Sequence, residues 1–411
     1  MANRRIHMGI GFATGRKNFK KVLKTYVYNW RECGLPDRDR VDLNLFVAYD
    51  LKYANTKSCD YTLLGREITE RFRTIHFIGT NRMKKIRDEL VDARILNGDT
   101  ARVLFGSGYS AKRNAILYAA LKSGMDSLLF LDDDEYPLAV AGTRSASVWG
   151  GQHVLPCHLK FLPDADLTNG YHCGYISPVP YIEFNHTLTE RDFRLFIEAL
   201  SNDVLNWDSM RSVIRNGGVT YADAGVLLGK SAREIPERNH CKFITGSNLC
   251  VNLTRPERVF PFYNPPGARG EDTFLSTCLG DRKVLRVPCY TFHDGFGAYP
   301  HLTDGVLPTR LKHVRADSAR VTARFYRTCV GWVRYKPLYV YLTDPGHYAE
   351  RIREIRGELK SVLPKICAYF ECGDFRSLLD ELDFYDRNVQ RHDRQFRDAR
   401  KAWGRMMRAV R

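Results

Sequence analysis

Four consecutive acidic residues, Asp132 to Glu135, follow an apolar run in the segment SLLFLDDDEYP. Carboxylates this close repel one another, and the repulsion grows as water is excluded. A buried strand that directs them into a cleft therefore predicts a cation at its end. The alternative is a solvated turn in which Asp134 or Glu135 caps the following backbone.

Basic side chains stand just before this strand, in the segment GSGYSAKRNAILYAA. Lys112, Arg113 and Asn114 fall at the start of a predicted helix that leads into the acidic strand. Positive side chains and a helix N-terminus then share a sheet edge with the carboxylates, which suits a metal-bound diphosphate. The alternative is ordinary capping by Ser110 beside a solvated Lys-Arg pair.

Two later segments add groups that can bind a metal or move a proton. ARGEDTFLS contains Glu271 and Asp272, and TFHDGFG contains His293 and Asp294. Two or three carboxylates with one imidazole suit Mn²⁺ or Mg²⁺, with phosphate oxygens and water completing the shell. A remaining carboxylate can then abstract a proton. The alternatives are a structural histidine and an acidic helix N-terminus.

The elements that must position these residues alternate along the first third of the chain. Apolar patterning predicts helices over 18–30 and 111–124, and strands over 6–12, 43–50, 73–79 and 127–131. Repeated strand-helix-strand units predict an α/β fold with a parallel sheet, whose ligands bind beyond the carboxyl ends of the strands. The acidic run falls at such an end. Residues 149–240 are irregular apart from a predicted helix over 190–203, and a compact unit follows over 242–297.

The chain of 411 residues carries a formal charge of +16, which favours an anionic partner. From residue 303 to 411 the pattern predicts a basic helical region, and Lys and Arg outnumber Asp and Glu by 22 to 13 between 311 and 411. In the last helix, arginines alternate with Phe396, Trp403, Met406 and Met407. That pattern predicts docking to an anionic acceptor, a membrane surface or nucleic acid, or alternatively packing on the catalytic domain.

Other patterns are weaker or negative. Eleven cysteines without CxxC pairs indicate a reducing compartment, and the absence of a long apolar segment predicts a cytoplasmic protein, peripheral at a membrane at most. A zinc site is disfavoured by its irregular spacing, and core packing is favoured over sugar stacking for several aromatic residues. The residues concerned are His153, Cys157, His158, His172 and Cys173 for zinc, and Trp149, Tyr171, Tyr175, Tyr181 and Trp207 for stacking.

Five motifs follow one another in the order GYSAKRN, LLFLDDDEYP, TGSNLCVN, GEDTFL and FHDGFG. In kind and order they resemble the motifs of nucleotide-sugar-dependent glycosyltransferases of the GT-A fold, most closely those of family 2. The resemblance covers about residues 6 to 297, and the triple aspartate is similar to that of galactofuranosyl transferases. It implies a Rossmann-like, mostly parallel sheet flanked by helices, in a catalytic domain over 1–302 with a donor half at about 1–137 and an acceptor half at about 138–302.

On the donor side, the resemblance implies that Asp132 and Asp134 meet the metal and the ribose and diphosphate of a nucleoside-diphosphate sugar, with a UDP-sugar favoured. Asp133 lies beside them, His293 completes the shell of Mn²⁺ or Mg²⁺, and Arg113 approaches the nucleotide or its phosphates.

On the acceptor side, the resemblance implies that Asp272 is the general base that deprotonates a hydroxyl of a glycan or other acceptor. Glu271 holds that acceptor, and Gly246, Ser247 and Asn248 shape the floor beneath it. Attack on the face opposite the leaving diphosphate inverts the anomeric configuration.

Two segments depart from the family pattern, namely GFATGRKN after the first strand and VAYDLKYANT after the second. The residues at these positions that are candidates for recognising the nucleotide base are Thr14, Arg16 and Asp50, and they do not match the family pattern. Two other functions stay open. One is a sugar-1-phosphate nucleotidyltransferase, and the other is a basic nucleic-acid-binding protein without catalysis.

Overall fold

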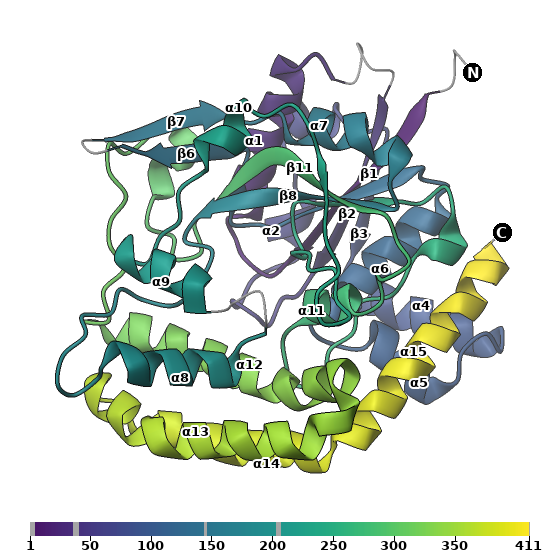
Figure 1. Cartoon of the computed structure of the whole chain (residues 1–411). Coiled ribbons are helices and arrows are strands. Elements are labelled where there is room, and N and C mark those ends of the chain that lie inside the picture. The colour runs from purple at the N-terminus through teal and green to yellow at the C-terminus, as the bar shows by residue number, and fades with distance from the viewer. Residues whose placement is uncertain (1–4, 36–40, 144–145, 203–206, 411) are drawn as a thin grey trace.

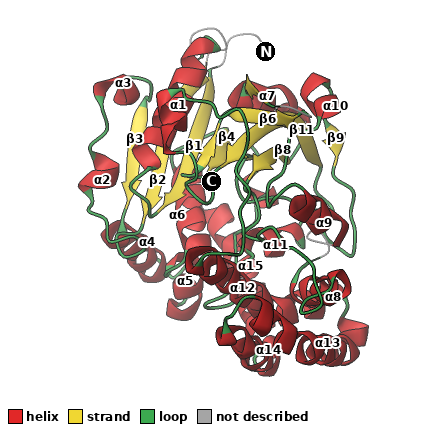
Figure 2. Cartoon of the chain, turned by 90° about the vertical axis from the view of Figure 1, so that its left-hand side faces the viewer, coloured by secondary structure: helices red, strands yellow, loops and turns green. Residues whose placement is uncertain are grey.

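The computed structural model describes residues 5–35, 41–143, 146–202 and 207–410. Its centre is a nine-stranded mixed sheet in the order β3-β2-β1-β4-β10-β8-β11-β5, with β9 paired to β11, and β6 and β7 form a separate hairpin (Figures 1 and 2). The strands are β1 (Ile6–Thr14), β2 (Val41–Tyr49), β3 (Thr74–Ile78), β4 (Ser127–Leu131), β5 (Glu135–Tyr136), β6 (Leu138–Gly142), β7 (Ser147–Gly151), β8 (Leu167–Gly174), β9 (Arg233–Glu234), β10 (Leu249–Asn252) and β11 (Val284–His293).

Helices cover both faces of the sheet and extend below it in Figure 1. In the first two thirds of the chain they are α1 (Phe19–Glu32), α2 (Cys59–Thr62), α3 (Arg66–Thr69), α4 (Thr80–Asp92), α5 (Gly98–Phe105), α6 (Tyr109–Lys122), α7 (Val154–Phe161), α8 (Glu190–Leu200), α9 (Trp207–Arg215), α10 (Ala224–Leu228) and α11 (Glu271–Ser276). The C-terminal helices are α12 (Ala319–Thr343), α13 (Tyr348–Tyr369), α14 (Ser377–Arg387) and α15 (Val389–Val410).

The first half of the sheet is the parallel unit that the sequence predicts. β1 pairs in parallel with both β2 and β4, and β2 pairs in parallel with β3. All five residues of β4 are buried, because helices cover both faces of the sheet here. The four predicted strands and the helices α1, α6 and α8 are therefore confirmed.

The second half of the sheet is mixed. β10 runs antiparallel to both of its neighbours, β4 and β8, while β8 and β11 pair in parallel. Following these pairings, β1, β2, β3, β4, β8 and β11 share one direction, and β5, β9 and β10 oppose it. As a result, β10 begins on the side of the sheet toward which β4, β8 and β11 run.

The C-terminal helices share a hydrophobic core with the sheet and its helices. Phe396, Trp403, Met406 and Met407 of α15 are all at most 2 % exposed. The Trp403 ring lies 6.4 Å from that of Phe105 in α5. The aromatic face of the last helix is thus packed on the domain, while docking of a partner through its basic face stays a prediction. No helix in the described ranges is long and apolar enough to cross a membrane.

Candidate active site

The acidic run does not form a solvated turn. Asp133 and Glu135 are each 3 % exposed, and each accepts hydrogen bonds from inside the protein. Asp133 accepts from the Thr14 hydroxyl at 2.5 Å and from Arg16 at 2.8 Å. The loop after β1 therefore supplies the positive charge beside this carboxylate, and Thr14 itself is 1 % exposed beneath it.

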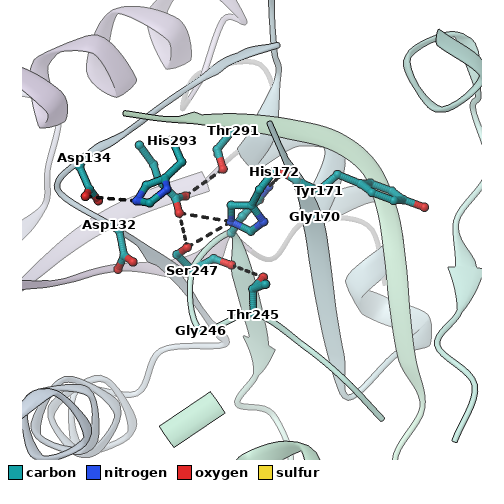
Figure 3. A network of polar contacts seen from close by, with 12 residues as sticks. Asp132, Asp134, Gly170, Tyr171, His172, Thr245, Gly246, Ser247, Thr291 and His293 are labelled. Carbon is teal, nitrogen blue, oxygen red and sulfur yellow. Dashed lines mark hydrogen bonds and ion pairs between the residues drawn. The ribbon is translucent and has the colours of Figure 1, made fainter. Parts of the chain in front are cut away.

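Asp134 lies between Arg16 and His293. The strand register explains the contact between Asp134 and His293, since β5 pairs with the end of β11 so that Glu135 is opposite His293. His293 Nε2 is 3.2 Å from Asp134 Oδ2, and Arg16 also forms an ion pair with Asp134 (Figure 3). Burial alone would lower the pKa of His293, but Asp134 raises that pKa to about 9. The same contacts hold the pKa of Asp134 below its ordinary value.

Asp132 is held by the start of α6. It accepts from Arg113 at 3.1 Å and from the Tyr109 hydroxyl at 3.0 Å. Burial, together with the neighbouring carboxylates and against the effect of Arg113, raises the pKa of Asp132 to about 7. Burial and the charge of Asp134 raise the pKa of Asp133 as well, against the effect of Arg16, so the repulsion within the acidic run falls on both residues.

Glu135 forms a buried network that the sequence did not predict, although Ser247 and His172 were named as candidates for other roles. Its carboxylate accepts from Ser247 and from Thr291, and His172 Nε2 lies 3.3 Å away (Figure 3). Burial would raise the pKa of Glu135, but His172, His293 and Ser247 hold it down at about 2. His172 is on β8 and Thr291 on β11, so this network joins both strands to the acidic run.

Arg113 is the central link between the two halves of the site. Its side chain is 2 % exposed and lies against the rings of Tyr109, Phe130 and Phe262. Besides Asp132, it donates to the Gly246 carbonyl and lies 3.7 Å from Glu271. The solvated Lys-Arg pair is excluded, and α6 begins after Gly108 without a side-chain cap from Ser110. In this geometry Arg113 positions carboxylates and has no exposed donor for a phosphate.

Glu271 and Asp272 begin α11, directly after Gly270. Gly270 has φ +91°, and a Cβ there would be 2.9 Å from the Tyr335 ring of α12, so the turn requires glycine. Burial, followed by the charge of Glu271, raises the pKa of Asp272 to about 6, despite Arg113. A carboxylate with this pKa is ionised at neutral pH but is a stronger base than ordinary aspartate, as proton abstraction requires.

The segment Gly246–Asn248, which is expected to shape the floor beneath the acceptor, is buried beneath the acidic run. Asn248 is fully buried, with its amide bonded to His158 and to the Tyr171 carbonyl. Ser247 is 5 % exposed and donates to Glu135. The β10 start therefore supports the acidic run from below, and a Cβ on Gly246 would be 3.1 Å from Arg113 Cζ.

Asp50 and Tyr53 follow β2 at the same sheet edge. Asp50 lies 3.6 Å from Lys112, which is itself only 8 % exposed. Tyr53 is 66 % exposed and lies on Gly15, where a Cβ would be 2.8 Å from the tyrosine Cβ. Tyr53 is an exposed ring beside Arg16 that sequence reasoning did not single out.

The histidines among the zinc candidates have separate partners. His158 bonds to Thr168 and Asn248, His172 faces Glu135, and His153 contacts Cys33. Most of the named aromatics pack in the core or bond to it. Figure 3 shows the Tyr171 ring directed away from the carboxylates. The Trp149 indole donates a hydrogen bond to the Pro308 carbonyl.

The described residues contain no group of three or more His, Cys, Asp or Glu side chains arranged to hold a metal ion. Asp134 and His293 have the right chemistry, but the positive charge next to Asp134 comes from Arg16 and His293. The cation that the acidic run demands is thus supplied, in this geometry, by side chains of the chain itself.

Comparison with known proteins gives no family for this chain. No protein-family model matches it, and no curated protein matches it either.

Proposed function

We propose that the protein is a nucleotide-sugar-dependent glycosyltransferase of the GT-A type that transfers a sugar, from a UDP-sugar by preference, to an acceptor hydroxyl with inversion. One observation carries the proposal. The acidic run after β4, the Glu271–Asp272 pair of α11 and His293 of β11 converge at one sheet edge, with Arg113 between the first two. Their order in the sequence, and the resemblance that rests on it, support the same assignment.

On the donor side, Asp132, Asp134 and His293 would hold Mn²⁺ or Mg²⁺, which would neutralise the charge that develops on the leaving diphosphate. The set has the carboxylates and imidazole that such an ion prefers, but among the described residues they are not arranged to hold one, so binding would require these side chains to move and His293 to lose its proton. Arg16 would give up its contact with Asp134 when an ion binds. Asp133 keeps Arg16 nearby through its own ion pair.

On the acceptor side, Asp272 takes the proton of the attacking hydroxyl. The acceptor oxygen bonds to the anomeric carbon as the bond from that carbon to the diphosphate breaks, and the electron pair leaves with the diphosphate. Glu271 is held by Arg113 and orients the acceptor beside the base. Since Arg113 also holds Asp132, one buried side chain sets the separation of donor and acceptor.

The test is a thermal-shift screen of nucleoside-diphosphate sugars with and without Mn²⁺, followed by transfer assays on the sugars that bind. A ligand that binds only the folded state raises its stability with the logarithm of concentration over Kd. We expect at least one UDP-sugar to raise the melting temperature more in Mn²⁺ than in EDTA, and Asp134→Asn to remove that difference. Asp99→Asn, at the exposed start of α5, is the matched control. Absence of any shift across the panel would overturn the proposal.

A further inference from the structure

Two arginines near the acidic run have no acidic partner. Arg16 and Arg113 are paired with carboxylates of the run, but Arg269 and Arg324 are not paired. Within the described ranges, no Asp or Glu lies within ion-pair distance of either guanidinium. Arg324 is half-buried, and an unpaired guanidinium that is partly withdrawn from water carries a desolvation cost, so its charge is available to an anion; Arg269 is exposed.

Arg324 reaches the site from α12, in the C-terminal helical region. A Cβ on Gly295 would lie 2.7 Å from Arg324 Nη2 and 3.2 Å from His293 Nε2, so both side chains lie against this one glycine. The Arg324 guanidinium stacks on the Phe296 ring, with 4.2 Å from Cζ to the centroid. The FHDGFG loop therefore places Arg324 beside the histidine that contacts Asp134.

Arg269 lies against the same helix, α12, and comes from the loop before α11. A Cβ on Gly331 would be 2.8 Å from Arg269 Cδ, so the Arg269 stem lies on α12. Gly331 and Arg324 are seven residues apart and thus on one face of that helix. Burial, opposed by the charge of Asp134 and helped by repulsion from Arg16 and Arg269, lowers the pKa of Arg324 to about 10. Arg324 is therefore within electrostatic reach of Asp134, Arg16 and Arg269, and it is charged at neutral pH.

We propose that Arg324 and Arg269, together with Arg16, form a binding site for the diphosphate group of the donor, so that the C-terminal helical region completes the active site. The ligand class is a pyrophosphate or nucleoside diphosphate, whose oxygens accept the paired N–H donors of a guanidinium. This inference rests on the proposed function for its place in the reaction. There, the arginines stabilise the negative charge that the diphosphate acquires when the bond to the anomeric carbon breaks.

The experiment measures binding of inorganic pyrophosphate and of UDP by calorimetry in EDTA, with the full chain. We expect the wild type to bind both, and Arg324→Gln to raise each Kd at least tenfold. Arg327→Gln is the matched control, because Arg327 is exposed on the same helix one turn further on. Arg269→Gln, which alters an exposed side chain, keeps the test valid if Arg324→Gln does not fold.

Weaker binding in Arg324→Gln and Arg269→Gln, with normal binding in Arg327→Gln, supports the inference. Failure of the wild type to bind pyrophosphate and UDP in EDTA would overturn it, as would unchanged binding in both variants. The sugar-transfer assay separates this result from the proposed function. Transfer that is insensitive to both arginines refutes the inference alone, whereas arginine-dependent pyrophosphate binding without any transfer refutes the proposed function and leaves the anion site standing.

Discussion

Replacing Asp272 by asparagine should make the protein more stable and less active. Burial and Glu271 raise the pKa of Asp272 from an ordinary 3.8 to about 6, so the folded protein holds this carboxylate at a cost when it is ionised. The difference corresponds to about 3 kcal/mol in the free energy of unfolding above pH 7. Asparagine carries no charge and so avoids this loss of stability. Its side-chain oxygen can still accept the hydrogen bond that the Thr273 amide donates to Asp272 Oδ1 at 2.9 Å.

The sign of the pH dependence follows from the raised pKa. Because the folded state binds this proton more tightly than the unfolded chain, the wild type loses stability as the pH rises from about 4 to about 6, and the variant does not. The two proteins should therefore differ most above pH 7 and converge toward pH 4. Urea unfolding at pH 5 and pH 8 measures this, with Asp99→Asn as the control that changes an exposed acid in another first helical turn.

The same substitution should reduce sugar transfer by about 10²-fold or more while donor affinity stays nearly unchanged. Wild-type transfer should also fall as the pH drops below about 6, because the base becomes protonated. A variant that is no more stable than the wild type at pH 8, or that transfers sugar at the wild-type rate, would refute the reasoning. In that case Asp272 is only an acidic residue at a helix N-terminus.

Three further predictions concern neighbouring residues. Asp134→Asn should lower the free energy of unfolding by about 1–3 kcal/mol in the absence of ligands, since Arg16 and His293 lose a charged partner; urea unfolding checks it. Glu135→Gln should lower the free energy of unfolding by at least about 2 kcal/mol in the same assay, because an amide nitrogen must face the Ser247 or Thr291 hydroxyl. An unchanged urea midpoint would contradict the network. Trp403→Ala should cost about 3–5 kcal/mol by removing a ring that is 1 % exposed, and a melting temperature equal to that of the wild type would show that α15 does not belong to the core.

Local patterns predicted the parallel half of the sheet well, for a physical reason. The five apolar residues of β4 are buried on both faces, and such runs bounded by glycine or acidic residues are readable without knowledge of the fold. The direction of β10 relative to its neighbours could not be predicted, because the LCVN segment has the same apolar character in either direction. Its antiparallel course is set by pairing with β4 and β8, which are far away in the sequence.

The sequence predicted which segments meet at the candidate site, but it did not predict which of their side chains are exposed. Asp134 and His293 are in contact as expected, but Arg113 and Asn248 are buried supports. Sequence alone does not separate a buried arginine that holds carboxylates from an exposed one that binds a ligand. The sequence did not single out Arg324, because it is one of many basic residues in the region 303–411, which was interpreted as a separate unit.

The packing of α15 on α5 has a consequence for how the chain folds during synthesis. Phe105 and Trp403 are in contact but are separated by about 300 residues, which a ribosome adds in roughly 15–60 s at ordinary rates of elongation. Throughout that interval the apolar side of α5 and α6 lacks its final cover. The nascent sheet is therefore exposed to aggregation until the last helix emerges, and we expect efficient production of this protein to depend on chaperones that bind exposed apolar surface.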